Sequence, residues 1–287
     1  MQNMSERLVG TFWGYQDAEL YYQTWQPSTS VGTIIITHGL AEHSDCYHDL
    51  ATDFGENKWR TFAWDLRGHG RSEGKRGYVN RFQDFCDDLE AFIRFVKSQK
   101  GVADHPLVLF GHSLGGLITL KTLLNHSPSQ ISALALSSPA LGLTVEVPKI
   151  KEKAAHFLSD WLPKMTMHNE IDFRQLTRDE KLVRSYKNDP FRHDKISPRL
   201  FLGMEAAMAE VLTGASEIHL PTIMQLAGRD RIVSTPSSEK FFDKLGSKRK
   251  EIFIYTESYH EIFNDLDRKE VIDDLLKFLN KKTGTPG

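Results

Sequence analysis

Short runs of β-forming residues alternate with helical patterns along most of this chain, and this alternation limits the possible folds more than any other feature. From residue 33 onward six such runs are separated by longer segments. The runs are TIIITH (33–38), RTFAWD (60–65), LVLFGH (107–112), ALALSS (133–138), TIMQLA (222–227) and EIFIYT (251–256). Strands that alternate with helices form βαβ units, in which the strands are parallel. We therefore predict an α/β fold, with helices on both faces of a mostly parallel sheet.

The chain before these runs adds two more strands. The stretch GTFWGYQDAELYYQTWQP (10–27) alternates apolar and polar residues, as an antiparallel hairpin does. Residues 82–99 place apolar side chains at the spacing of a helix that lies on a sheet, namely Phe82, Phe85, Leu89, Phe92, Ile93 and Val96. With the hairpin, the predicted sheet has eight strands.

The alternation of strands and helices stops after Pro139. From residue 141 to 198 only helical pieces follow, such as PKIKEKAAHFLSDWLPKM and LTRDEKLVRSYKNDP, and no strand is predicted there. The strands resume at PTIMQLAG. We expect a core formed by residues 1–140 and 199–282, a helical cap inserted at 141–198, and a flexible tail at 283–287.

The first helical piece of the cap carries an apolar stripe beside several lysines. The stripe consists of Ile150, Ala154, Phe157, Leu158, Trp161 and Leu162, and the lysines are Lys149, Lys151, Lys153 and Lys164. A basic amphipathic helix of this kind can rest on a membrane surface. The pattern is equally that of a cap helix packed on its own core, which is the interpretation we favour. Four of the stripe residues (Phe157, Leu158, Trp161 and Leu162), with Met165 and Met167, could also line a tunnel for an acyl chain.

Composition excludes several classes of function. With 36 Lys and Arg against 38 Asp and Glu, the chain lacks the basic excess of a nucleic-acid-binding protein. Cys46 and Cys86 form neither a disulfide framework nor a CxxC pair, and the first residues lack the pattern of a signal peptide. No apolar run approaches the roughly 18 residues of a membrane span. We expect a cytoplasmic chain with free thiols, whose contact with a membrane would be peripheral.

Ser113 stands where an apolar run turns into a helical pattern, in LVLFGHSLGGLITLKTLL (107–124). The G-x-S-x-G pattern alone is weak evidence, because Gly and Ser are both frequent residues. A strand before it and a helix after it make it typical of a nucleophile elbow, in which glycines allow the sharp turn that exposes the serine above the sheet. A serine hydroxyl also needs a base and an acid that orients the base.

Two loops that follow later strands offer these partners. Catalytic groups of open α/β sheets gather beyond the carboxyl ends of the strands. His260 follows the last predicted strand, and Asp230 follows the one before it, which gives the order Ser, Asp, His that accompanies a nucleophile elbow. Asp65 also ends a strand, but it precedes the serine, and we assign it to closing its own loop. The histidines that fit less well are His219, which precedes its strand, and His126, His156, His168 and His193, which fall in helices or in the cap.

The oxyanion of a tetrahedral intermediate needs backbone N–H donors. Leu114, the residue after the serine, offers one at the start of its helix. The loop HGLAEHS (38–44), which follows the first parallel strand, offers another, and we assign it to Leu40.

In these motifs the chain resembles the monoacylglycerol lipase and lysophospholipase group of the α/β-hydrolase superfamily. The matching stretches cover nearly the whole chain and are HGLAEHSDCY, AWDLRGHGRSEGKRGYV, GHSLGGLI, LTRDEKLVRSYKNDPF, LAGRDRIV and YHEIFND. The resemblance implies an α/β-hydrolase fold, Ser113 as the nucleophile, Asp230 and His260 as its partners, and oxyanion donors at Leu40 and Leu114.

The head-group site of this family is only partly matched. In the family's mammalian enzyme, the glutamate of HGxxEHS and an arginine four residues later help to hold the glycerol head group. Glu42 matches that glutamate, but Cys46 stands at the arginine position. Glu42 therefore either contacts the substrate or fixes its own loop, and lysophospholipids fit as well as monoacylglycerols. A buried, inert thiol at Cys46 is more usual than a reactive one.

Together these features predict a serine carboxylester hydrolase that cleaves single-acyl lipids through an acyl-enzyme, with no metal or organic cofactor. The same triad also serves general esterases, thioesterases, aminopeptidases and cofactor-free haloperoxidases. An α/β-hydrolase fold that only binds a ligand or a partner is the alternative outside enzymes. Such proteins usually lose a member of the triad, whereas this chain has all three. The inserted cap could move as a lid over the site.

Overall fold

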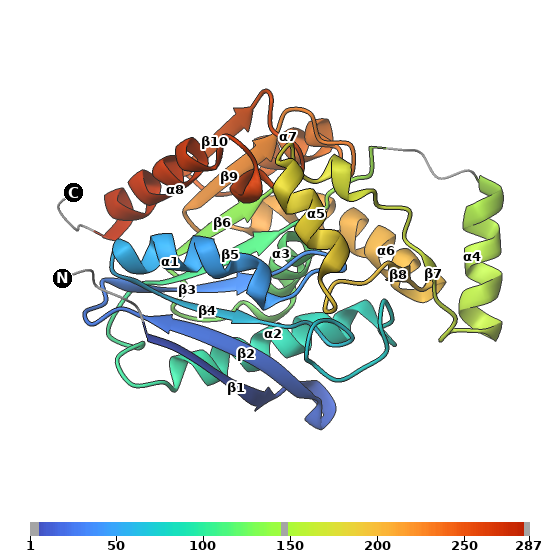
Figure 1. The fold of residues 1–287 in the computed structure, drawn as a ribbon, viewed down its shortest axis with the longest axis horizontal. Helices are drawn as coiled ribbons and strands as arrows, with labels where there is room; N and C mark the ends of the chain where they lie inside the picture. Colours follow the sequence, from blue (N-terminus) through green and yellow to red (C-terminus); the bar gives the residue numbers. More distant parts are fainter. Residues whose placement is uncertain (1–5, 145–148, 284–287) are drawn as a thin grey trace.

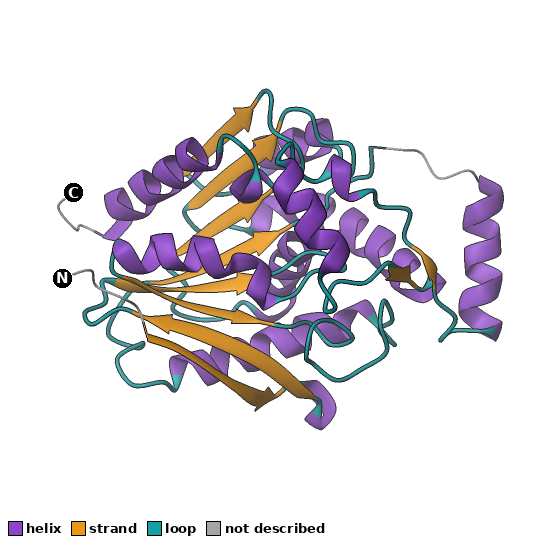
Figure 2. Ribbon diagram, in the orientation of Figure 1, coloured by secondary structure: helices purple, strands orange, loops and turns teal. Residues whose placement is uncertain are grey.

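One eight-stranded sheet runs through the molecule, and helices cover both of its faces (Figures 1 and 2). The structure is a computed structural model that describes residues 6–144 and 149–283, without the side chains of 149–152, 282 and 283. The strand order is β1-β2-β4-β3-β5-β6-β9-β10. β2 pairs antiparallel with β1 and β4, and the other neighbours are parallel. This confirms the predicted α/β class and the mostly parallel sheet of eight strands.

The bounds of the sheet strands are close to those predicted from sequence. They are β1 (Glu6–Trp13), β2 (Glu19–Gln26), β3 (Gly32–Thr37), β4 (Trp59–Trp64), β5 (Leu107–His112), β6 (Ala133–Ser137), β9 (Thr222–Ala227) and β10 (Lys250–Tyr255). The helices are α1 (His48–Glu56), α2 (Phe82–Lys97), α3 (Leu114–His126), α4 (Lys149–Trp161), α5 (Glu180–Asn188), α6 (Pro198–Gly214), α7 (Thr235–Lys244) and α8 (Arg268–Thr283). The six predicted parallel strands, the hairpin and the helix at 82–99 are therefore confirmed.

The segment between β6 and α6 differs from the prediction in one respect. It contains the helices α4 and α5, but also a two-stranded antiparallel sheet formed by β7 (Met167–His168) and β8 (Lys195–Ile196). The prediction that this segment has no strand was wrong, because a strand of two residues is too short to show an alternating pattern. Of the predicted tail, Thr283 is the last residue of α8, and residues 284–287 lie outside the described part of the chain.

The large aromatic residues of the predicted α4 stripe do not pack on the core, contrary to the interpretation favoured from sequence, whereas the side chain of Ile150 lies outside the described part of the structure. Phe157 is 62% exposed and Trp161 73% exposed. The helix instead packs through the small residues Ala155 and Ser159, and Arg199 of α6 donates a hydrogen bond to the Ser159 carbonyl at 2.7 Å. Small residues permit this close contact, and Phe157 and Trp161 lie on the opposite, exposed side of the helix.

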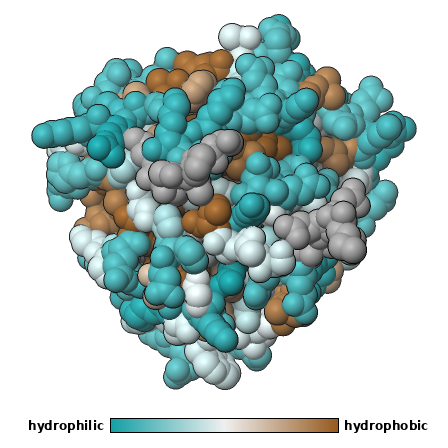
Figure 3. All heavy atoms as spheres, turned by 90° about the vertical axis from the view of Figure 1, so that its left-hand side faces the viewer, coloured by the Kyte–Doolittle hydropathy of each residue, from teal (hydrophilic) through white to brown (hydrophobic). Residues whose placement is uncertain are grey.

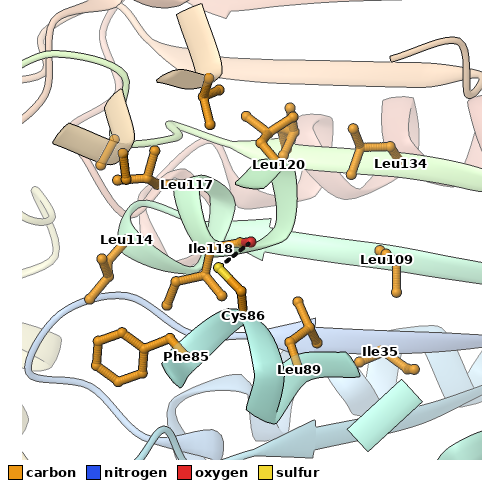
Figure 4. Close-up of a cluster of buried hydrophobic side chains, with 14 of the residues drawn as sticks. Ile35, Phe85, Cys86, Leu89, Leu109, Leu114, Leu117, Ile118, Leu120 and Leu134 are labelled. Atoms are coloured by element: carbon orange, nitrogen blue, oxygen red, sulfur yellow. Dashed lines mark hydrogen bonds between the residues drawn. The ribbon is translucent and has the colours of Figure 1, made fainter. Parts of the chain in front are cut away.

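The sheet separates two apolar clusters, one on each face. The larger cluster holds side chains of α2, α3, α6 and α7, and the smaller one holds those of α1 and α8. Figure 4 shows part of the larger cluster, in which Leu114, Leu117 and Ile118 of α3 meet Phe85 and Leu89 of α2. Helix α3 is thus held by its apolar side chains against both the sheet and α2.

Glycine residues let the first turn of α3 lie directly against the sheet. A Cβ atom on Gly115 would lie 2.0 Å from the carbonyl oxygen of Thr37, the last residue of β3. One on Gly111, in β5, would lie 2.7 Å from the Cα atom of Gly116. Neither contact can be relieved by rotating a side chain, since the opposing atoms belong to the backbone.

We predict that Gly115→Ala lowers the free energy of unfolding by about 1–3 kcal/mol, since overpacking costs this much when the surroundings have to shift. Urea unfolding of the purified protein measures the change. The matched control is Gly203→Ala in α6, where the new Cβ meets the Phe82 side chain at 3.1 Å. There the better helix propensity of Ala, about 1 kcal/mol, offsets the contact. Equal stability of Gly115→Ala and wild type would contradict the prediction.

Candidate active site

The loops that follow β3, β5, β9 and β10 meet at the carboxyl edge of the sheet, beneath the segment 141–198, which we call the cap. They enclose a cavity of about 30 Å³. Its core residues include Leu40, Glu42, His112, Ser113, His260 and Glu261, and the cap adds Asn169, Ile171, Phe173, Leu176 and Arg192. The structure therefore brings four of the predicted site residues, Leu40, Glu42, Ser113 and His260, to one cavity.

Ser113 sits on a strained turn between β5 and α3. Its φ of +51° and ψ of −120° lie in a region that residues other than glycine rarely adopt. Two backbone hydrogen bonds hold the turn. The N–H of Ser113 donates to the Ser137 carbonyl at 3.0 Å, and the carbonyl of Ser113 accepts from the N–H of Ala140 at 2.9 Å. The serine is 8% exposed and faces the cavity. This is the geometry of a nucleophile elbow.

Asp230 and His260 form a direct pair. Nδ1 of His260 donates to Oδ2 of Asp230 at 2.7 Å, and both side chains are buried. The other carboxylate oxygen of Asp230 accepts the N–H groups of Ile232 at 2.8 Å and Val233 at 2.9 Å. These bonds fix the orientation of the carboxylate. The carboxylate in turn fixes the imidazole through Nδ1, so Nε2 of His260 points away from Asp230.

The protonation of this pair follows from its contacts. Burial acts to raise the pKa of Asp230, but the His260 imidazole and the two backbone N–H groups outweigh burial, so that the pKa is lowered. Burial acts to lower the pKa of His260, but Asp230 outweighs it, and Glu261 adds to the effect, so that the pKa is raised. The aspartate is thus held ionised, and the imidazole beside it is made more basic.

The two predicted oxyanion donors occupy different places. Leu114 is the first residue of α3, with its side chain in the core cluster of Figure 4, so its N–H lies at the helix N-terminus beside Ser113. Leu40 lines the cavity from the loop after β3. Backbone N–H groups at a helix N-terminus favour negative charge, which suits this end of the site to an oxyanion.

Glu42 fixes the loop that carries Leu40. Its Oε2 atom accepts the N–H of Gly39 and the hydroxyl of Tyr47, both at 2.8 Å. Its Oε1 atom lies 3.9 Å from Nη2 of Arg192, and the residue lines the cavity. The loop-fixing alternative from sequence is thus supported by direct contacts, while the second oxygen lies near Arg192 and His112. Burial and the neighbouring carboxylate of Glu261 raise the pKa of Glu42 to about 7.

Arg192 and Glu261 were not predicted from sequence, although both line the cavity. Arg192 donates from Nη1 to Oε1 of Glu261 at 3.2 Å, and its guanidinium lies 3.7 Å from the ring centre of Tyr186. The Tyr186 hydroxyl donates to Oε2 of Glu261 at 2.5 Å. Burial acts to raise the pKa of Glu261, but Arg192 and its other partners outweigh burial and lower the pKa to about 2. Only the position of Glu261 next to His260 in the chain could have indicated it beforehand.

Cys46 is not a reactive thiolate in this structure. The residue is half-buried, and burial raises the pKa of its thiol, while Arg192 acts in the opposite direction. Its sulfur, with His43 and Asp189, forms a group of possible metal ligands whose donor atoms lie within 4.8 Å of one another. Two of these three residues, His43 and Asp189, are already joined by a 2.8 Å hydrogen bond between Nε2 and Oδ2, which is a contact between core and cap.

The alternative acid and base candidates lie outside the cavity. Asp65 accepts the N–H groups of Ser44 and Arg71, both at 2.7 Å, which is the loop-closing role expected for it. His219 donates from Nδ1 to the Gly246 carbonyl at 3.1 Å, and it precedes β9, so it lies at the end of that strand opposite to Asp230. Among the cavity-lining residues the imidazoles are His112 and His260. His112 is bonded through Nδ1 to Ser137, and burial lowers its pKa to about 3, so it stays neutral.

Comparison with known proteins agrees with this geometry. The sequence profile of the family described as serine aminopeptidase S33 matches residues 28–267. The chain belongs to this family, within the α/β-hydrolase superfamily. The chain is 29% identical to a monoacylglycerol lipase of Mycolicibacterium smegmatis, over 96% of its own length and 98% of the relative. It is also 29% identical to phospholipase YtpA of Bacillus subtilis, over 86% of the chain and 95% of the relative.

A solved structure of this family has the same fold. The monoacylglycerol lipase of Paleococcus ferrophilus superposes with a TM-score of 0.83 at 29% identity, over 92% of this chain and 99% of that one. The fold class and the family resemblance predicted from sequence are therefore confirmed. The chain is a hydrolase of the α/β-hydrolase superfamily. Within the described residues, no helix combines the length and apolar character that crossing a bilayer requires.

The pKa of Glu42 leads to a prediction about stability. A carboxyl group whose pKa is about 7 in the folded protein, against 4.5 ordinarily, binds more protons when folded, so stability falls as pH rises from 4.5 to 7. Glu42→Gln should remove this loss, which amounts to roughly 1–3 kcal/mol. Urea unfolding at a series of pH values measures it.

Glu261→Gln is the matched control for that measurement. Because the pKa of Glu261 is lowered to about 2, its contribution is present above pH 4.5 and is lost as pH falls toward 2. The two variants should therefore alter different pH ranges. Equal slopes of stability between pH 4.5 and 7 for wild type and Glu42→Gln would show that Glu42 titrates normally.

Proposed function

We propose that the chain is a serine hydrolase that cleaves single-acyl lipid esters through an acyl-enzyme, with Ser113, Asp230 and His260 as its triad. The observation that carries the proposal is the 2.7 Å bond between His260 and Asp230, made at the cavity into which the strained Ser113 turn projects. A base oriented by a carboxylate beside a serine on a nucleophile elbow is the arrangement that activates a hydroxyl.

In the proposed reaction, His260 removes the proton from the Ser113 hydroxyl through Nε2 as the oxygen attacks the ester carbonyl. Asp230 keeps the Nδ1 proton in place and stabilises the imidazolium that forms. The N–H groups of Leu40 and Leu114 stabilise the oxyanion. The leaving alcohol takes the proton from His260, and water, deprotonated by the same imidazole, then releases the fatty acid from Ser113.

The cavity is lined by both apolar and polar side chains, as a single-acyl lipid requires. Ile171, Phe173 and Leu176 of the cap offer an apolar wall for the acyl chain. The six apolar cap residues considered from sequence do not line the cavity, so the tunnel expected there is not supported. The polar part of the lining has two carboxylates, Glu42 and Glu261, but one guanidinium, that of Arg192, and this balance of charge disfavours an anionic phosphate. Together with the relatives named monoacylglycerol lipase, this favours a neutral glycerol head group over a lysophospholipid.

Residues 141–198 are proposed to act as a movable lid. A cavity of about 30 Å³ has room for about one water molecule, far less than the roughly 300 Å³ or more of a ligand pocket. A lipid can therefore enter only if the cap shifts. The part that includes α5 is anchored, since Arg178 is bonded to the buried Asp265 at 3.1 Å. The movement is thus expected in α4 and in the small sheet of β7 and β8, and Arg192, which lies between α5 and β8, shifts with that sheet.

The exposed face of α4 is proposed to meet the lipid surface. Phe157 and Trp161 are stacked at 6.1 Å, and Leu162 beside them is 52% exposed. Lys153 and Lys164, also exposed, flank this apolar group. Helix α4 lies at the right-hand end of the molecule in Figure 1, whereas the left-hand face, seen in Figure 3, is mainly hydrophilic with small separate apolar patches. We place the enzyme in the cytoplasm, consistent with its free thiols, in peripheral contact with membranes.

Replacing the nucleophile tests the activity. Ser113→Ala should lower the turnover of a short p-nitrophenyl ester by about 10⁴-fold or more, because the acyl-enzyme cannot form. Wild type should also react with a fluorophosphonate probe, and should hydrolyse a monoacylglycerol faster than a lysophospholipid of equal chain length. The control is Ser98→Ala, an exposed serine at the end of α2. Normal turnover by Ser113→Ala would rule out the proposed nucleophile, and a folded wild type that never reacts with the probe would favour a binding function.

Removing the two aromatic side chains of α4 tests the membrane contact. Phe157→Ser with Trp161→Ser should weaken binding to vesicles of phosphatidylcholine and an anionic lipid by about tenfold, as expected for lost burial of two large side chains. Turnover of a short soluble ester should stay unchanged, because neither side chain lines the cavity. Leu266→Ser is the control, since Leu266 is 64% exposed outside the cap. Co-sedimentation measures binding, and an equal loss with Leu266→Ser would argue against a surface specific to α4.

A further inference from the structure

Arg192 is a residue of the cap that reaches two carboxylates of the core. It donates from Nη1 to Oε1 of Glu261 at 3.2 Å, and its Nη2 atom lies 3.9 Å from Oε1 of Glu42. The side chains of all three residues are 3–5% exposed. The guanidinium is further held by the Tyr186 ring at 3.7 Å. Its Nε atom is buried without a hydrogen-bond partner among the described residues, so the contacts with the carboxylates are made by Nη1 and Nη2.

Each of the two carboxylates belongs to a different part of the catalytic centre. Glu42 accepts the N–H of Gly39 and so sets the loop of Leu40, the proposed oxyanion donor. Glu261 directly follows His260, and Asn264 and Tyr186 bond its other oxygen at 3.0 and 2.5 Å. The guanidinium therefore joins the oxyanion loop to the histidine loop, although neither loop is its own.

We propose that Arg192 is a positioning residue that aligns the oxyanion loop with the His260 loop, and that the cap completes the catalytic centre by supplying it. The proposal rests on the proposed function. It differs from simple anchoring of the cap, which Arg178 already provides through Asp265 and Asp267 away from the cavity. When the cap shifts to admit a lipid, Arg192 leaves the two carboxylates, and the centre is aligned again only when the cap returns.

The charge of Arg192 also bears on the protonation of His260. The titratable and charged groups facing this centre are Asp230, Glu42, Glu261, His112, Cys46, Tyr47, Tyr186 and Arg192. Below pH 7, where Glu42 already carries a proton in the wild type, loss of the guanidinium leaves the charge of Glu261 unbalanced, so the surroundings of His260 become more negative. A more negative environment favours the imidazolium, so the pKa of His260 should rise. Loss of the Glu261 charge should act in the opposite direction, since Glu261 raises that pKa in the wild type.

Kinetics on a short p-nitrophenyl ester tests the proposal, because this substrate has no head group to bind. Arg192→Met should lower kcat by about 100-fold, the size of effect that misplaced reacting groups produce, with KM changed by less than about threefold. The acid limb of the pH profile of kcat/KM, which reports the pKa of His260 in the enzyme without substrate, should move to higher pH. Glu261→Gln should move the same limb to lower pH. Arg192→Lys, which keeps the charge but not the two-pronged fork, should restore the wild-type limb and only part of kcat.

Arg199→Met is the matched control, because it removes an arginine contact between the core and the cap, the hydrogen bond to the Ser159 carbonyl of α4, that does not touch the cavity. It should lower thermal stability while leaving kcat and the acid limb as in wild type. The proposal is overturned if Arg192→Met or Arg192→Lys, shown to be folded by circular dichroism, has wild-type kcat, or if the limbs of Arg192→Met and Glu261→Gln do not move in opposite directions. A wild type that does not hydrolyse the ester at all would instead refute the proposed function, so the two failures are distinguishable.

Discussion

The close packing of α3 against β3 and β5 is the constraint on which the rest of the site depends. Gly111, Gly115 and Gly116 bring helix and sheet backbones together without intervening side chains. The chain must then turn sharply at Ser113, whose positive φ is the consequence. The same contact places the N-terminus of α3 beside the loop after β3. The serine, the helix terminus and the oxyanion loop are thus set by one backbone contact rather than by separate interactions.

The parallel sheet supplies the remaining parts of the site. β9 and β10 end at the same edge as β5, so the loops that carry Asp230 and His260 meet above it. Each loop is then fixed by local bonds, such as those from the N–H groups of Ile232 and Val233 to the aspartate. The sheet brings the residues near one another, and the loop contacts determine which atoms face each other.

Sequence was sufficient for the features that repeat or that follow the strands. The alternation of strands and helices predicted the sheet, and positions beyond strand ends predicted that Ser113 and His260 share a cavity and that Asp230 meets the histidine. The sequence was insufficient where a contact joins distant segments, because no periodic pattern of residues marks such a contact. Arg192 lies just beyond the cap stretch quoted for the family resemblance, and nothing in the chain links it to Glu42 or Glu261. For α4 the apolar stripe led to a wrong prediction, because Ala155 and Ser159 form the packed face whereas Phe157 and Trp161 are exposed.

The buried charges also explain how the cap could be both mobile and precise. Two carboxylates and a guanidinium are costly to bury unless they pair well, so a partly displaced Arg192 is worse than a fully docked or fully released one. Glu42, with a pKa of about 7, can take up a proton when the guanidinium departs, which limits the cost of release. In intermediate positions of the cap, Arg192 would neither pair with the two carboxylates nor be hydrated by water. We therefore propose that the cap moves between two states, and that only the docked state holds the oxyanion loop and His260 in register.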